Sequence, residues 1–135
     1  MDWWESVSFS RASGDQSEAP ISFPSSFWKN IVAEKTYLIR LGDGARKRHC
    51  HKTEKGQVIA FMVQLEVKVE ESVWRIVLRY GCAHDFAHKD RYNIQGEQDK
   101  EELSLTYTEA LDLADKDIND NWEVYKERFL RGIFP

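Results

Sequence analysis

The four histidines of this sequence fall into two pairs, and they are the first candidates for chemistry. His49 and His51 are separated by one residue, and His84 and His88 by three. An imidazole with its ordinary pKa of about 6.5 accepts or donates a proton near neutral pH, and in its neutral form it is a common metal ligand. We therefore expect a functional site where these side chains meet.

Two stretches of alternating apolar residues lie between the histidine pairs and predict a β-hairpin with one face committed to a core. The alternating residues are Ile59, Phe61, Val63, Leu65, Val67 and Val69 in the first strand and Trp74, Ile76, Leu78, Tyr80 and Cys82 in the second. Antiparallel pairing across a short turn brings the start of the first strand beside the end of the second. Both histidine pairs are therefore expected at the same edge of the sheet.

One chemistry open to such a group of histidines is the cleavage of RNA without a metal. One imidazole would act as general base for the 2′-hydroxyl group and another as general acid for the leaving oxygen. Arg79 or Lys52 would stabilise the charge that develops on the phosphate. The candidate catalytic residues are His49, His51, His84, His88, Arg79 and Asp85.

A basic run coincides with the first histidine pair, since six of the seven residues from Arg46 to Lys52 are basic or histidine. Such a run would bind phosphate groups, or it would be a solvated surface loop whose charge only aids solubility. The formal net charge of −4 argues against nucleic acid coating the whole surface but permits a local basic patch. The candidate nucleic-acid-binding residues are Arg46, Lys47, Arg48, Lys52, Lys89 and Arg91.

Two other interpretations of the histidines stay open. They would converge on Zn²⁺ or Fe²⁺, with Asp85 or Glu54 as an oxygen ligand, whereas the metal-free chemistry needs no cofactor. Alternatively, they are partly buried and hydrogen-bonded to backbone or carboxylate groups. The sequence has no P-loop, dinucleotide-binding glycine pattern, paired CxxC or HExxH, which argues against most cofactor-carrying and kinase-like functions. The candidate metal ligands are His49, His51, His84 and His88.

The elements that position these residues predict an α+β fold. A strand is expected at Thr36 to Leu41, and the polar stretch from Lys89 to Glu102 is expected to be mostly loop. Thr106 and Glu109 form a capping box, followed by apolar residues at intervals of three and four. We therefore predict an antiparallel sheet of three to five strands with a long C-terminal amphipathic helix packed on one face. Its apolar stripe is Leu111, Ala114, Ile118, Trp122, Tyr125 and Phe129.

The length of 135 residues predicts a single domain with a core over 27–135. An aromatic and polar N-terminal segment over 1–26 precedes it, and its composition is compatible with flexibility. No apolar run approaches the roughly 20 residues of a transmembrane helix, and no signal peptide is recognisable. We expect a cytoplasmic protein without membrane contact, with Cys50 and Cys82 as free thiols.

The run from Val73 to Tyr80, followed by His84, His88, the Gly96-Glu97 step and a helix, resembles the small TumE-like toxins of bacterial and archaeal toxin–antitoxin pairs. The resemblance covers about Val73 to Trp122. It implies a nucleic-acid-acting toxin with a cognate protein partner, in which His84, His88 and Arg79 would be the acid–base residues. Alternatively, it implies a related small uncharacterised prokaryotic family that shares only the scaffold. Gly81 stands where that family has an aspartate.

Together, the histidines and the basic run predict a small toxin-like ribonuclease or RNA-binding protein. The alternative is a non-catalytic interaction module, antitoxin-like or a phage-encoded inhibitor, that contacts a partner through Trp3 and Trp4 or through the basic run. A histidine-ligated metal enzyme is the third possibility. The oligomeric state is left open.

Overall fold

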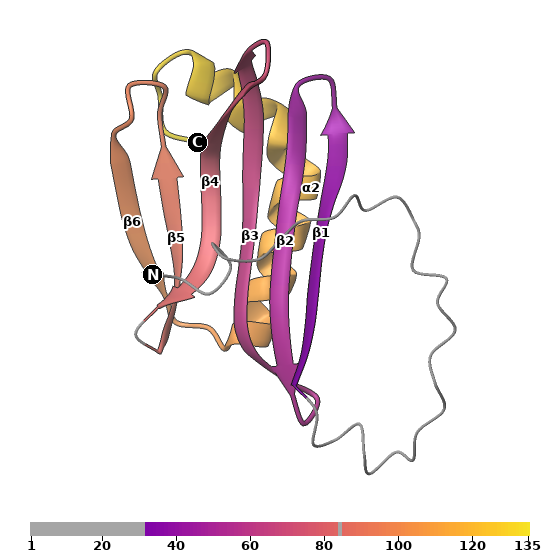
Figure 1. Ribbon diagram of the computed structural model, residues 1–135. Helices are drawn as coiled ribbons and strands as arrows, with labels where there is room; N and C mark the ends of the chain where they lie inside the picture. Colours follow the sequence, from indigo (N-terminus) through magenta and orange to yellow (C-terminus); the bar gives the residue numbers. More distant parts are fainter. Residues whose placement is uncertain (1–31, 84) are drawn as a thin grey trace, which may run out of the picture.

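The structure is a computed structural model that describes residues 32–83 and 85–135. These residues form one antiparallel sheet in which every strand pairs with its sequence neighbour, and a single long helix follows (Figure 1). The strands are β1 (Val32–Gly42), β2 (Ala45–Glu54), β3 (Gln57–Glu70), β4 (Val73–Ala83), β5 (Phe86–Tyr92) and β6 (Gln98–Leu103), and the helix is α2 (Tyr107–Leu130). The features expected within the N-terminal segment lie outside the described residues.

The sheet has six strands, so the predicted range of three to five was wrong. The basic run, considered above as a surface loop, is strand β2, and the polar stretch after the hairpin contains β5 and β6. These three strands carry charged side chains, so they lack the apolar alternation that identifies a strand from sequence. The α+β class and the β3–β4 hairpin are as expected.

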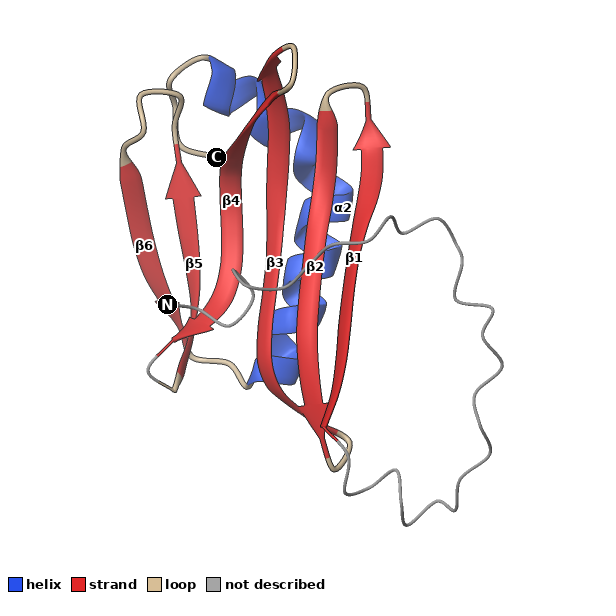
Figure 2. Ribbon diagram, in the orientation of Figure 1, coloured by secondary structure: helices blue, strands red, loops and turns tan. Residues whose placement is uncertain are grey.

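Helix α2 lies across one face of the sheet (Figure 2), which we call the helix side; the opposite face is the far side. The capping box is formed as predicted, because Glu109 N donates to Thr106 Oγ1 and Thr106 N donates to the Glu109 carboxylate. The apolar stripe of α2 packs on β3 and β4 and buries a continuous core. The fully buried core side chains include Phe61, Val63, Leu65, Val67, Leu78, Tyr80, Ile118 and Phe129.

Irregular pairing between β3 and β4 reverses the alternation of β4 part of the way along its length. Leu65 pairs with Leu78, but Glu66 pairs with Ile76, so Val77 is an extra residue. One extra residue moves the side chains on either side of it to opposite faces. Trp74 consequently lies on the far side, level with Lys68, although its spacing from Leu78 predicted the core face.

The turn between β1 and β2 is held by the second half of α2. The Trp122 ring packs against Gly42, where a Cβ atom would lie only 2.6 Å from Trp122 Cη2. Lys126 Nζ donates to the carbonyl oxygen of Asp43 at 2.9 Å, and Gly44 adopts a positive φ of 67° to close the turn. The helix therefore fixes the end of the sheet at which β1 and β2 meet.

This contact predicts that Gly42→Ala lowers the free energy of unfolding by about 1 to 3 kcal/mol, because the added methyl group overpacks against the indole. Denaturant unfolding of wild type, Gly42→Ala, Trp122→Phe and the double variant measures the effect. Part of the loss should be recovered in the double variant, since the smaller ring makes room. If Gly42→Ala lowered the free energy of unfolding equally in the wild-type and Trp122→Phe backgrounds, the contact between Gly42 and Trp122 would be contradicted.

Candidate functional site

Strand β2 distributes the basic run over both faces of the sheet. Alternate residues of the strand point to the helix side, namely Lys47, His49 and His51. The residues between them, Arg46 and Arg48, point to the far side. The alternation of the strand thus divides one continuous run into two chemically different groups. Each group is completed by side chains from other elements.

The group on the helix side, which we call the histidine cluster, consists of Tyr37, Lys47, His49, His51, Asp115 and Asn119. His49 is only 2% exposed and stacks on the Tyr37 ring, with the ring centroids 4.4 Å apart. Nε2 of His49 lies 2.8 Å from Nδ1 of His51, and Nδ1 of His49 faces Asp115 Oδ1 at 3.5 Å. The two imidazoles and the carboxylate therefore form a chain.

Lys47 anchors the inner end of this chain. Its side chain is 4% exposed, and Nζ donates to Asp115 Oδ1 at 2.8 Å and to Asn119 Oδ1 at 2.9 Å. A buried ammonium group requires such partners, because an unpaired buried charge is strongly destabilising. Strand β2 and helix α2 are consequently joined by polar contacts here rather than by apolar packing.

The electrostatics of the histidine cluster favour an ionised Asp115 carboxylate and a neutral His51. The contact with His49 and the hydrogen bond from Lys47 lower the pKa of Asp115 to about 2, against the opposing effect of burial. Burial, His49 and Lys35 lower the pKa of His51. Asp115 is therefore ionised at neutral pH, and His51 resists taking up a charge of its own.

The group on the far side, which we call the arginine cluster, consists of Arg46, Arg48, Arg79, Gln64 and Glu66. Arg46 Nε and Arg48 Nε donate to the two carboxylate oxygens of Glu66 at 2.7 and 2.6 Å. Gln64 also donates to Glu66, and Arg79 Nε donates to Gln64 Oε1 at 2.8 Å. Burial raises the pKa of Glu66, but the hydrogen bonds from Arg48, Gln64 and Arg46 outweigh this effect and lower it. The charged ends of the arginines are thereby held in fixed positions.

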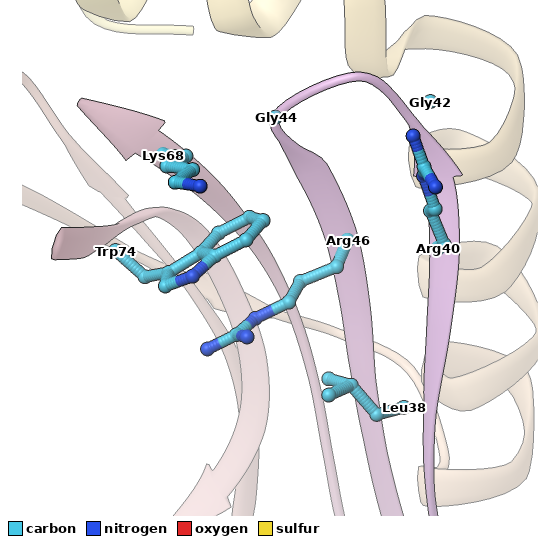
Figure 3. A pocket seen from close by; sticks show the side chains of 7 residues that line it. All are labelled: Leu38, Arg40, Gly42, Gly44, Arg46, Lys68 and Trp74. Atoms are coloured by element: carbon cyan, nitrogen blue, oxygen red, sulfur yellow. The ribbon is translucent and has the colours of Figure 1, made fainter. Parts of the chain in front are cut away.

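A pocket of about 430 Å³ lies beside the arginine cluster, where β1, β2, β3 and β4 meet (Figure 3). The guanidinium of Arg46 lies over the indole of Trp74, 3.9 Å from the ring centroid. Among the described residues that line the pocket, three are basic and none is acidic. We call it the Trp74 pocket, and its lining residues are Leu38, Arg40, Gly42, Gly44, Arg46, Lys68 and Trp74.

The structure does not bring the described histidines to one point. His88 lies on β5 and pairs with Gly81, and it points to the far side, where its Nδ1 is 3.6 Å from Asp90 Oδ2. It is therefore on the face opposite His49 and His51. Asp85 lies in an exposed turn with a positive φ of 70°. His84 lies outside the described residues, so its placement in a catalytic group stays a prediction.

The expected nucleic-acid-binding residues divide in the same way. Arg46, Arg48 and Lys52 are on the far side, with Lys52 close to Glu34. Lys47 is buried in the histidine cluster. Lys89 approaches Asp117 of α2, and Arg91 pairs with Asp99 and Glu101 of β6. Of the expected residues, Arg46 lines the Trp74 pocket, and Arg48 contacts the same Glu66 carboxylate as Arg46.

Sequence reasoning missed several residues of these sites. Trp74 was assigned to the core because the extra residue in β4 gives no sequence signal. Lys68 and Arg40 were missed because each is a single charge on a strand. A signal did exist for Asp115: it is an acidic residue one turn after Leu111, directly beside the apolar stripe of the helix.

Two properties of the described residues bear on cofactors and membranes. No group of three or more His, Cys, Asp or Glu side chains within residues 32–83 and 85–135 is arranged to hold a metal ion. In the same ranges, no helix has the length and apolar character needed to cross a membrane.

The fold and these clusters define a small α+β protein whose meandering sheet carries different polar groups on its two faces. Residues 32–135 match the family model described as domain of unknown function (DUF7718), and the chain belongs to that family. The matched region begins at the first residue of β1 and includes all six strands and α2. No curated protein and no solved structure matches the chain.

The lowered pKa of His51 predicts a pH dependence of stability. The unfolded chain, with a histidine pKa of about 6.5, takes up a proton more readily than the folded protein does. The contribution of neutral His51 to the free energy of unfolding is therefore complete above about pH 6.5, the unfolded pKa. It is lost as the pH falls toward the lower pKa of His51 in the folded state. The melting temperature should fall less in His51→Gln than in wild type between about pH 7.5 and 5.5. Equal decreases would contradict the burial of His51 beside His49.

Proposed function

We propose that this protein binds single-stranded RNA on the far side of its sheet, with one base in the Trp74 pocket and the flanking phosphates on the surrounding basic side chains. The observation that carries this proposal is the stacked pair of Arg46 and Trp74 in a pocket lined by cations. Aromatic rings and guanidinium planes on a sheet surface are the groups on which unpaired bases stack.

The pocket has the size and charge that such a ligand needs. Its volume of about 430 Å³ is within the range of small-molecule sites and accommodates one base. Arg40 and Lys68 lie on opposite sides of its opening, on β1 and β3, and both are exposed (Figure 3). Arg40 also forms an exposed ion pair with Asp43 at 2.7 Å. Lys68 is exposed, so a phosphate at the opening of the pocket can reach its ammonium group.

The fixed positions of Arg46 and Arg48 favour binding at a defined site over attraction of RNA to the protein as a whole. Because Glu66 holds Arg46 and Arg48, little side-chain entropy is lost when a ligand meets them. The net charge of −4 gives no attractive field over the whole molecule, so binding depends on this local patch. A base that is paired within a duplex cannot enter the pocket. The site therefore favours single-stranded RNA over double-stranded RNA.

The placement of the histidines does not support RNA cleavage as part of the proposal, because His49 and His51 point away from the far side. The protein-interaction alternative rests on aromatic residues outside the described ranges. Toxin activity and a cognate partner, which the TumE-like resemblance implies, stay predictions.

Reversing the charge of Lys68 tests the phosphate contacts. Lys68→Glu should weaken binding of a labelled single-stranded RNA, measured by fluorescence anisotropy. The slope of log K against log salt should be shallower in the variant than in wild type, because the variant loses a phosphate contact. Lys116→Glu is the matched control, because Lys116 is an exposed lysine of α2 that pairs with Asp120. Equal loss in the two variants would attribute binding to net charge and would overturn the site.

Removing the indole tests the stacking contact. Trp74→Ala should cost about 1 to 3 kcal/mol of binding free energy, the range for one stacked base, while Trp74→Phe should retain most of the affinity. A salt titration of Trp74→Ala should keep the wild-type slope, since the substitution removes no charge. Unchanged affinity in Trp74→Ala would show that bases do not enter the pocket.

A further inference from the structure

We propose that Asp115, His49 and His51 form a proton relay that makes Nε2 of His51 a general base on the helix side of the sheet. This site is separate from the RNA surface, because the two lie on opposite faces. His51 would be the catalytic residue, and His49 and Asp115 would be positioning residues. The suited substrate is an ester that carries a negative charge and is hydrolysed by water.

The direction of the relay follows from the contacts of the buried histidine. Nδ1 of His49 is buried and faces the Asp115 carboxylate at 3.5 Å, so it carries a proton there, since a lone pair would face a negative charge. Nε2 of His49 is then an acceptor, and Nδ1 of His51, 2.8 Å away, is the donor. This arrangement leaves the lone pair of His51 on Nε2.

The groups around the pair decide where an incoming proton rests. His51 is partly exposed and stands opposite Lys35 of β1, whose ammonium charge opposes a second charge on His51. His49 lies beside the carboxylate of Asp115, although Lys47 neutralises part of that charge. A proton taken up at Nε2 of His51 is therefore passed from Nδ1 of His51 to Nε2 of His49, and the positive charge comes to rest next to Asp115. The Tyr37 ring stacked on His49 keeps the imidazole in place.

The same arrangement suggests the substrate class. In hydrolysis, Nε2 of His51 takes a proton from water while the water oxygen forms a bond to the ester carbon. The bond from that carbon to the alkoxide oxygen breaks, and the alkoxide leaves with the proton that the relay returns. Lys35 is the exposed cation nearest in register to His51, so it favours a substrate with a carboxylate or phosphate group.

Acylation by diethyl pyrocarbonate tests the relay without a natural substrate. Nε2 of His51 bonds to a carbonyl carbon of the reagent, ethyl carbonate leaves, and the Nδ1 proton passes to His49. Peptide mapping by mass spectrometry should give a several-fold slower acylation of His51 in Asp115→Asn than in wild type. Asp112→Asn, an exposed carboxylate one turn earlier on α2, is the matched control and should react at the wild-type rate. Equal rates in wild type and Asp115→Asn would overturn the relay.

The tautomers of the wild-type protein provide evidence that does not depend on a folded variant. In imidazole ¹⁵N NMR spectra of the neutral rings, Nδ1 of both His49 and His51 should have the shift of a protonated nitrogen, and Nε2 of both should have the shift of a nitrogen with a lone pair. A proton on Nε2 of His51 instead of on its Nδ1 would overturn the proposal. Asp115→Asn should leave RNA affinity unchanged, so failure of the relay and failure of RNA binding are distinguishable.

A pair of activated esters tests the substrate class. Wild type should hydrolyse the 4-nitrophenyl monoester of terephthalate, whose carboxylate cannot reach its own ester, faster than 4-nitrophenyl benzoate, relative to free imidazole, and Lys35→Gln should remove this preference. His51→Gln should abolish the excess over the uncatalysed rate. No preference for the charged ester would overturn the substrate assignment, even if the relay itself is present.

Discussion

The packing of α2 against one face of the sheet is the constraint on which both candidate sites depend. A strand alternates its side chains between two faces, and the helix decides which of these faces becomes interior. Over β3 and β4 the interior is apolar and continuous. Over β2, at the side of the helix, the interior is polar, and Lys47 and His49 are buried against Asp115 and Asn119. The helix therefore builds the core and the histidine cluster with the same set of contacts.

The buried charges are costly unless they are paired, which explains the specific partners found in each cluster. Asp115 receives Lys47 and faces His49, and Glu66 receives Arg46 and Arg48. In an ordinary amphipathic helix Asp115 would be fully solvated, whereas here its side chain is 40% exposed and accepts a hydrogen bond from Lys47. Groups that are held this firmly are pre-organised, which lowers the entropy lost on binding or reaction. This property favours function over a purely structural role for both clusters.

Two features of the structure place residues on a different face of the sheet from the one that the sequence pattern predicts, or on both faces. The extra residue at Val77 moves Trp74 from the expected core to the far side, where it meets Arg46. The pairing of β2 between β1 and β3 converts a basic run into a two-faced strand. Periodicity could not reveal either feature, because the first breaks the period and the second has polar residues on both faces. The count of strands was underestimated for the second reason.

The sequence alone determined the elements whose signals are local. The β3–β4 hairpin follows from apolar alternation, and α2 follows from its capping box and its stripe of apolar residues, so the α+β class could be derived from them. Tertiary structure decided which chemical groups meet. It joined His49 to an aspartate 66 positions later in the chain and placed His88 on the opposite face. Such contacts depend on strand register and on the docking of the helix, and these arise from the simultaneous packing of all the elements rather than from the spacing of neighbouring residues.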